Sequence, residues 1–210
     1  MHSLQEMGDH GRVTTGLRER KKLATRAALH EAALRLVAER GLASVSVDDI
    51  ADRADVSPRT FFNYFSSKDD AVLGLDPEAS ARQVAAFLAR PGDETPVEAL
   101  RSVARAQAEE MATDTDLWPL RLKVIDTEPA LLGRLAAVFG EGEKALAEAV
   151  AARTGTRAGT DAYPTLLAGV AGVAMRTALH RWLTSDFTAA LPDLLDDAWD
   201  LLAACLPAPR

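Results

Sequence analysis

The chain has 210 residues, of which 48% are hydrophobic, and a formal net charge of −7. This length allows one or two compact domains, and the apolar content is high enough for a packed core, which excludes wholesale disorder. A single cysteine, Cys205, excludes an internal disulfide and a cysteine-rich metal site. The same scarcity of thiols fits a protein of the reducing cytoplasm.

Targeting and membrane segments are not expected. Residues 1–12 are polar and lack the apolar core of a signal peptide. The longest apolar stretches, such as residues 166–175, are shorter than the ~18 residues that a membrane span needs. We therefore expect a soluble cytoplasmic protein that makes no membrane contact.

The distribution of charge is more informative than its total. Residues 1–70 carry 11 basic and 11 acidic side chains, whereas residues 71–210 carry 13 and 20. Between positions 12 and 26 there are six cations and a single acid, Glu19. Positive charge concentrated at one end of an acidic chain is compatible either with nucleic-acid binding or with a solvated basic helix.

In chain order, residues 1–16 are glycine-containing and without apolar periodicity, so they predict a flexible tail. Helical periodicity at Leu23, Ala27, Leu34 and Val37 predicts a first helix over residues 17–40, ended by Gly41. Shorter helices are expected at 47–54 and 58–65 and from residue 68. Further helices are expected at 77–89, 95–113, 116–126, 128–153, 161–184 and 189–205. The fold class is therefore all-α.

Helix-starting signals define the segment from residue 42 to residue 68. Ser46 followed by Asp49 approximates a capping box. Ser57 is a good N-cap, and Pro58 suits a first helical position. Two helices joined by a tight turn within about 20 residues match the helix-turn-helix, in which the second helix enters the DNA major groove. The same geometry also occurs in proteins that do not bind DNA.

The second of these helices has a polar face and an apolar face. Arg59, Thr60, Asn63 and Tyr64 are hydrogen-bonding residues of the kinds that reach base edges and phosphates. Phe61 and Phe65 are four residues apart and are expected to face the core. Lys68 begins the next helix, where helix-dipole considerations disfavour a cation and a phosphate partner would explain one.

The stretch from residue 26 to residue 73 resembles the DNA-binding domain of TetR-family repressors. The agreement is densest in GL at 41–42, SVDDIA at 46–51, VSPRTFFNYF at 56–65 and SKD at 67–69. Phe62 stands where family members often have Tyr, which removes one hydroxyl. The resemblance implies a DNA-binding domain over 17–73, a ligand-binding and dimerisation domain over 74–210, and a palindromic operator as the DNA partner. The residues expected at the DNA are Arg18, Arg20, Lys21, Ser46, Ser57, Arg59, Thr60, Asn63, Tyr64 and Lys68.

The C-terminal part is expected to form a homodimer and to bind a small-molecule effector. Residues 166–174 are rich in small residues that permit close helix approach, and the last helix has a broad apolar stripe from Leu191 to Cys205. The alternative is a stripe that packs only within its own chain. Residues 116–134 resemble a TetR subgroup that senses acyl-CoA-like molecules. Expected pocket residues are Trp118, Arg121, Leu122, Ile125, Phe139, Met175, Arg176, Leu179 and Trp182, with the two arginines meeting an acidic head group.

Rival functions have less support in the sequence. HExxH, GxSxG and glycine-rich phosphate motifs are missing, so an enzyme is not expected, and neither is a metal or cofactor. A helical dimeric interaction protein without operator binding remains an alternative, as does an activator instead of a repressor. The most direct interpretation is a ligand-released repressor.

Overall fold

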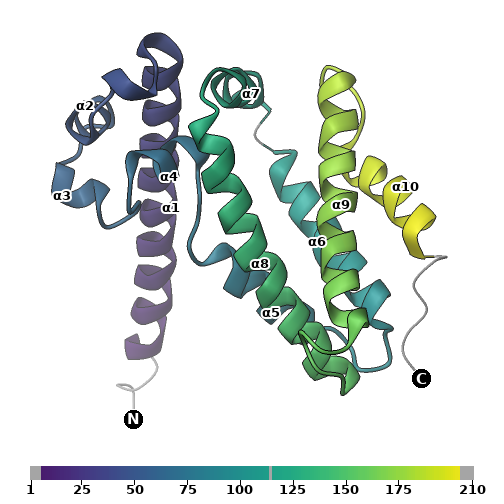
Figure 1. The fold of residues 1–210 in the computed structure, drawn as a ribbon. Coiled ribbons are helices and arrows are strands. Elements are labelled where there is room, and N and C mark those ends of the chain that lie inside the picture. Colours follow the sequence, from purple (N-terminus) through teal and green to yellow (C-terminus); the bar gives the residue numbers. More distant parts are fainter. Residues whose placement is uncertain (1–5, 114, 204–210) are drawn as a thin grey trace. The chain divides into compact units, whose positions relative to one another are not determined.

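The computed structural model describes residues 6–113 and 115–203, and within these residues every regular element is helical (Figure 1). This confirms the all-α prediction. The first helix, α1, spans Glu6–Arg40, and the short 3-10 helix η1 spans Leu42–Ser44. The remaining helices are α2 (Val47–Arg53), α3 (Pro58–Phe61), α4 (Lys68–Leu73), α5 (Ala79–Leu88), α6 (Pro96–Met111), α7 (Trp118–Thr127), α8 (Ala130–Thr154), α9 (Ala162–Thr184) and α10 (Leu191–Ala203).

The chain divides into two compact units, and their boundary differs from the predicted one. The first unit contains the chain up to Asp76 and also Pro119–Leu132; the second contains Pro77–Trp118 and the chain from Gly133 onward. A single break near residue 74 was predicted instead. Most of α7 therefore belongs to the N-terminal unit, where its polar side chains have their partners.

The long helix α1 begins at Glu6, so helix replaces the predicted flexible tail over residues 6–16, while residues 1–5 lie outside the described part. Extending an existing helix adds one hydrogen bond for each residue that is fixed, which is easier than starting a new helix. Of the predicted apolar stripe, Leu34 and Val37 are buried, but Leu23 is 63% exposed and Ala27 is exposed. The packed face of α1 thus begins near Leu29.

The core of the N-terminal unit joins α1 to the three short helices that follow it (Figure 1). Ile50, Ala51 and Phe61 are completely buried, as the spacing predicts. The Phe61 ring meets Phe62 edge-on at 5.3 Å between centroids and lies 5.9 Å from Phe65. These ring contacts lie within residues 61–65, while α3 packs against α2 and α2 packs against α1.

The second unit is a bundle in which α9 and α10 pack together and both contact α6. Trp182 and Trp199 are among its largest fully buried side chains. Trp118 meets Trp182 edge-on at 5.6 Å between centroids, and Trp182 meets Phe187 at 4.9 Å. Across one side of this core, Arg101 of α6 donates to Asp196 of α10 at 2.7 Å. Charge pairing therefore supplements apolar packing between α6 and α10.

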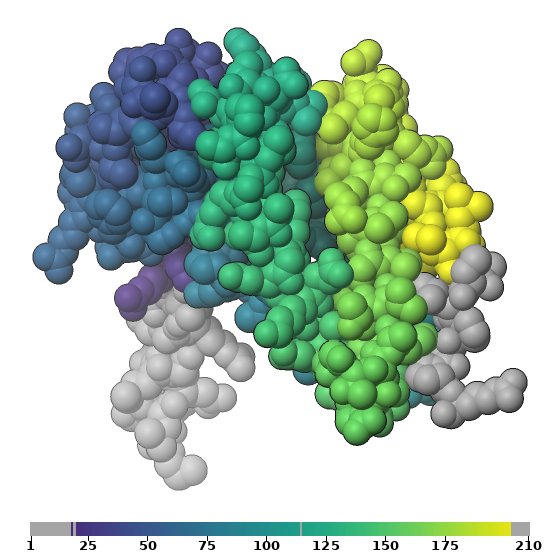
Figure 2. Space-filling model, viewed as in Figure 1, coloured from purple at the N-terminus to yellow at the C-terminus, as the bar shows by residue number. Residues whose placement is uncertain are grey.

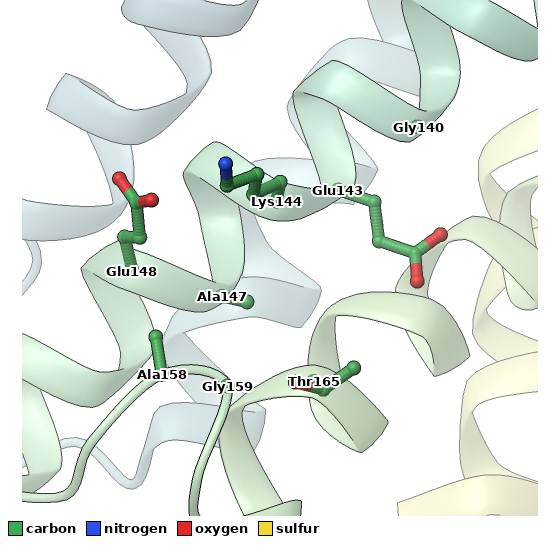
Figure 3. A pocket seen from close by; sticks show the side chains of 8 residues that line it. All are labelled: Gly140, Glu143, Lys144, Ala147, Glu148, Ala158, Gly159 and Thr165. Atoms are coloured by element: carbon green, nitrogen blue, oxygen red, sulfur yellow. The ribbon is translucent and has the colours of Figure 1, made fainter.

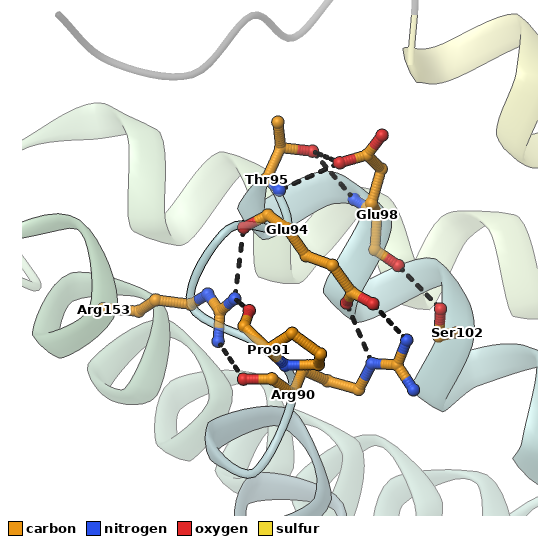
Figure 4. A network of polar contacts seen from close by, with 7 residues as sticks. All are labelled: Arg90, Pro91, Glu94, Thr95, Glu98, Ser102 and Arg153. Carbon is orange, nitrogen blue, oxygen red and sulfur yellow. Dashed lines mark hydrogen bonds and ion pairs between the residues drawn. The ribbon is translucent and has the colours of Figure 1, made fainter.

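Arg153, near the end of α8, fixes the turn between α5 and α6 (Figure 4). Its guanidinium donates to the carbonyls of Arg90 and Glu94, both at 3.1 Å, and also to that of Pro91. Its carbon Cζ lies 5.5 Å from the centre of the Phe87 ring. Immediately afterwards Thr95 and Glu98 form a capping box that starts α6. One arginine thus satisfies three carbonyls that the turn leaves without helical partners.

None of the helices that the described residues form has the length and apolar character needed to cross a membrane. Within the same residues, no three histidine, cysteine or acidic side chains come together as a group able to hold a metal ion.

Phe61→Ala should lower the free energy of unfolding of the N-terminal unit by about 3–5 kcal/mol, because it removes a fully buried ring and leaves a cavity. Phe62→Ala is the matched control, since the Phe62 side chain is 59% exposed. Urea unfolding followed by circular dichroism measures both. Equal effects of the two substitutions would contradict the assignment of Phe61 to the core.

Candidate nucleic-acid interface

The first helix of the helix-turn-helix is started by the predicted capping box. The Ser46 hydroxyl accepts the Asp49 N–H at 3.1 Å, and the Asp49 carboxylate accepts the Ser46 N–H at 2.9 Å. Hydrogen bonds from Ser46 hold the pKa of the Asp49 carboxyl below its ordinary value. The cap is therefore complete at neutral pH and is lost as the pH falls through that lowered value. Because the Ser46 hydroxyl also donates to Asp49, it is already occupied by the cap.

The second helix, α3, is shorter than predicted, ending at Phe61 instead of near residue 65. Ser57 caps it by accepting the Thr60 N–H at 3.1 Å, with Pro58 at the first position. Beyond Phe61 the chain tightens, because Asn63 N–H bonds to Thr60 and Tyr64 N–H bonds to Phe61, each three residues back. A 3-10-like turn therefore completes the segment that carries the predicted reading residues.

The predicted reading residues differ in how exposed their side chains are. Arg59 and Asn63 are exposed, and Thr60 and Tyr64 are half-buried. The hydroxyls of Ser57 and Thr60 lie 2.9 Å apart and bond to each other. The side chains most available to a partner on this segment are therefore Arg59 and Asn63, with Phe62 as an exposed apolar neighbour.

Two cations near this segment bind backbone carbonyls. Arg26 donates to the Tyr64 carbonyl at 2.9 Å, and its guanidinium lies 4.4 Å from the centre of the Phe65 ring. Lys68 donates to the carbonyls of Leu42 and Val45, at 2.7 and 2.9 Å. The phosphate contact of Lys68 stays a prediction, but the structure gives its ammonium a different and local explanation. Arg26 thus stabilises the turn that carries the reading residues, and Lys68 stabilises the turn that leads into α2.

The basic stretch of α1 presents further cations. Arg18, Arg20 and Lys21 are all exposed, as a phosphate-binding role requires. They stand on the same helix whose later residues pack against α2 and α4. The N-terminal unit therefore has exposed cations on α1 and exposed polar side chains on α3.

The predicted pocket residues separate into groups. In the second unit Trp118 and Trp182 are buried in the core, with Met175 and Leu179 packed against it. In the N-terminal unit Leu122 and Ile125 line an open depression of about 550 Å³. Phe139 is 56% exposed, and Arg176 is exposed as well. The shared role of these residues in lining a ligand cavity stays a prediction.

Arg121 differs most from its prediction as a ligand for an acidic head group. Its guanidinium lies 2.6 Å from Nε2 of His30, a buried histidine on α1. His30 was not among the residues predicted from the sequence. The sequence feature that indicates a buried polar contact at His30 is its place in the apolar part of α1, four positions before Leu34.

A separate pocket of about 340 Å³ lies in the second unit, between α8 and the start of α9 (Figure 3). Glu143, Lys144 and Glu148 supply charged groups around it, while Ala147 and Ala158 supply small apolar ones. Both helices lie at the surface on the face drawn in Figure 2. None of the predicted pocket residues lines this pocket.

The last two helices have apolar surface both inside and outside the bundle. Leu191, Leu195 and Ala198 of α10 are buried in their own chain, as the intrachain alternative expects. On α9, however, Leu166 is 54% exposed and Val173 is 45% exposed. Leu201 of α10 is 77% exposed as well, so the candidate dimer surface among the described residues includes both α9 and α10, and Cys205 falls outside them.

Comparisons with known proteins agree with this architecture. The profile described as "MftR C-terminal domain" matches residues 94–207, and that of "Bacterial regulatory proteins, tetR family" matches residues 29–73. The HTH-type transcriptional regulator TcmR of Streptomyces glaucescens is 31% identical over 173 residues, which cover 80% of this chain and 76% of TcmR. The chain belongs to the TetR family of bacterial transcriptional regulators.

Further relatives are similar over most of their length. The putative mycofactocin biosynthesis transcriptional regulator MftR of Mycobacterium tuberculosis is 30% identical, and the match covers 89% of this chain and 93% of MftR. The fatty acid degradation regulator FadR of Bacillus halodurans has the same fold, with a TM-score of 0.54 at 21% identity, covering 88% of this chain and 97% of FadR. TetR-family regulators bind DNA and small molecules and act as dimers, and they are generally not enzymes.

For this TetR-family chain, Leu166→Asp should convert a dimer into a monomer, because a carboxylate would be buried at the apolar surface of α9. Light scattering should give twice the 22.5 kDa chain mass for the wild type and the single mass for the variant. Leu88→Asp on α5, where the side chain is 50% exposed, is the matched control and should stay dimeric. A dimeric Leu166→Asp would place the dimer contact elsewhere.

Proposed function

We propose that the protein is a repressor that binds a palindromic operator through α3 and α1 and is released from it by a small amphipathic ligand. The observation that carries the DNA-binding part is the surface of the N-terminal unit. There, Arg59 and Asn63 are exposed on a segment whose apolar side is fixed by Phe61 and Phe65. A rigid support beneath exposed hydrogen-bonding side chains is what reading base edges in a groove requires.

The other predicted DNA residues have supporting roles in this proposal. Arg18, Arg20 and Lys21 contribute phosphate contacts from the exposed surface of α1. Ser46, Ser57 and Thr60 keep their helix caps and approach the backbone of the operator, and Tyr64 borders the groove. Lys68 keeps its two carbonyl partners and offers its remaining N–H to a phosphate. Because the proposed partner is chromosomal DNA, the protein acts in the cytoplasm.

The proposed ligand site is the pocket beside α8. Its volume of about 340 Å³ is at the lower end of the range for small-molecule sites. Lys144 offers a cation, Glu143 and Glu148 offer carboxylates, and Ala147 and Ala158 offer apolar contact, so the lining suits a ligand with both polar and apolar parts (Figure 3). An acyl-CoA-like molecule is one ligand of this amphipathic class, and the similarity in fold to a fatty acid degradation regulator supports that choice.

One experiment distinguishes the proposed repressor from the alternative, a helical dimer without operator binding. Fluorescence anisotropy with DNA from the upstream region of the protein's own gene should show tight, selective binding compared with a random duplex. Raising the salt from 50 to 200 mM should weaken binding by about 10³-fold if roughly six phosphates are contacted. Arg59→Ala should weaken selective binding at least tenfold without changing stability, because Arg59 is exposed.

Arg157→Ala is the control for this experiment, since Arg157 is an exposed cation of the second unit. It should leave operator affinity within about twofold of the wild type, given that long-range interactions between exposed charges are screened. Binding that is salt-sensitive but no better than to the random duplex, and equal for Arg59→Ala, would contradict the operator-reading role.

The ligand part is tested by adding a long-chain acyl-CoA to the protein–DNA complex. We expect at least tenfold weaker operator binding at saturation, because a ligand can shift DNA affinity only by its differential affinity for the two states. Lys144→Gln should need a higher concentration for the same effect, while Lys123→Gln, in the other unit, should not. Saturating ligand with unchanged operator affinity would exclude release by this class of molecule.

A further inference from the structure

The segment 119–132 is a part of the C-terminal sequence that packs in the N-terminal unit. The chain passes out of the second unit after Trp118 and returns to it at Gly133. Within the N-terminal unit this segment has two polar contacts far apart in sequence. Arg121 meets His30 of α1, and Glu128 meets Leu42 of η1.

The contact between Arg121 and His30 requires one protonation state of the imidazole. Nδ1 of His30 lies 2.7 Å from the Ala71 carbonyl oxygen, which can only accept, so Nδ1 carries the proton. Nε2 therefore offers its lone pair to the Arg121 guanidinium at 2.6 Å. A second proton on the ring would turn Nε2 into a donor that faces a fixed cation. The geometry thus requires a neutral His30.

The second contact acts at the start of the helix-turn-helix. The Glu128 carboxylate accepts the Leu42 N–H at 2.7 Å, while Lys68 donates to the Leu42 carbonyl at 2.7 Å. Both polar groups of this residue are therefore held by charged side chains from other elements. Three residues after Leu42 comes Val45, the second carbonyl partner of Lys68, and then Ser46, the cap of α2. Glu128 thereby helps fix where α2 begins.

We propose that Arg121 and Glu128 are positioning residues for DNA binding, acting on the helix-turn-helix from outside the N-terminal sequence, and that neutral His30 makes this positioning proton-dependent. The inference rests on the proposed DNA-binding function. Arg121 fixes the position of α7 against α1, and Glu128 fixes the conformation of the turn that leads into α2. Neither side chain needs to touch DNA. Their effect is on the placement of α2, against which α3 packs.

The charged groups around His30 determine whether the contact with Arg121 is present at high or at low pH. On α7 the guanidinium of Arg121 disfavours a charged imidazole, and Arg26, one turn earlier on α1, adds positive charge. On α4, Asp70 is buried next to Ala71 and favours a charged imidazole, but it already accepts from Ser66. Because the guanidinium is the direct partner of Nε2, protonation breaks the contact, so positioning is present at higher pH and lost as pH falls.

The first test needs no DNA. Hydrogen exchange by NMR on the full chain should show at least tenfold faster exchange of the Leu42 amide in Glu128→Ala. Glu141→Ala, an exposed glutamate of α8, is the control and should leave that amide unchanged. In the wild type at pH 7.5, imidazole NMR should show His30 neutral with the proton on Nδ1. An unaltered Leu42 amide, or a charged His30 at this pH, would overturn the proposed contacts.

The second test measures operator affinity against pH. Imidazole side chains ordinarily titrate near pH 6.5, and the Arg121 guanidinium disfavours the charged form of His30, so the comparison runs from about pH 7.5 down to about pH 5.0. The wild type should lose at least fivefold in affinity over this range relative to His30→Gln, which can still accept from Arg121 but cannot become charged. His180→Gln, at an exposed histidine of α9, should keep the wild-type pH profile. A wild-type profile retained in His30→Gln would overturn the proton link.

Arg121→Met should bind the operator at least fivefold more weakly than the wild type already at pH 7.5, with its pH profile flattened. Lys123→Met removes the same charge from an exposed position on the same helix and should stay within twofold. Equal losses in the two variants would reduce the effect to long-range charge and overturn the positioning role. If even the wild type shows no selective DNA binding, the proposed function fails, while the exchange and imidazole measurements still decide the contacts themselves.

Discussion

The helices of the DNA-binding surface are too short to stand alone. α2, α3 and α4 contain seven, four and six residues, and isolated helices shorter than about 12 residues are marginal in water. Each therefore depends on groups outside itself. Ser46, Ser57 and Ser67 each satisfy an amide of the first turn; α2 and α4 pack against α1, and α3 packs against α2. The long helix α1 is the common support on which the reading segment is assembled.

The backbone carbonyls and amides in the turns between these helices also need hydrogen-bond partners. A buried backbone group without a partner is destabilising, and turns leave many such groups. Here long charged side chains provide the partners. Arg26 donates to the Tyr64 carbonyl, and Lys68 donates to the carbonyls of Leu42 and Val45. Glu128 accepts the Leu42 N–H. Side chains with several donors or acceptors can tie two segments together, so the same contacts that satisfy the backbone also determine the positions of the helices.

The sequence predicted the elements better than the side-chain partners. Helix caps act locally, so the starts of α2 and α3 were predicted correctly. The burial of Phe61 and Phe65 was also predicted correctly, from their four-residue spacing. The length of α3 and the start of α1 were not, because tertiary packing and helix extension set them. The partners of Lys68 and Arg121 were missed, since both lie more than 20 residues away in sequence. The roles of the predicted DNA and ligand residues stay predictions.

Gly74 adds a constraint of a different kind to the same region. It ends α4 with a left-handed backbone, φ +65°, and a Cβ built on it would lie 3.0–3.2 Å from three atoms of the His30 ring. The imidazole therefore occupies the space that any other residue at position 74 would fill. A side chain at position 74 would require the imidazole to shift, so the bare backbone at the end of α4 forms part of the pocket that holds His30.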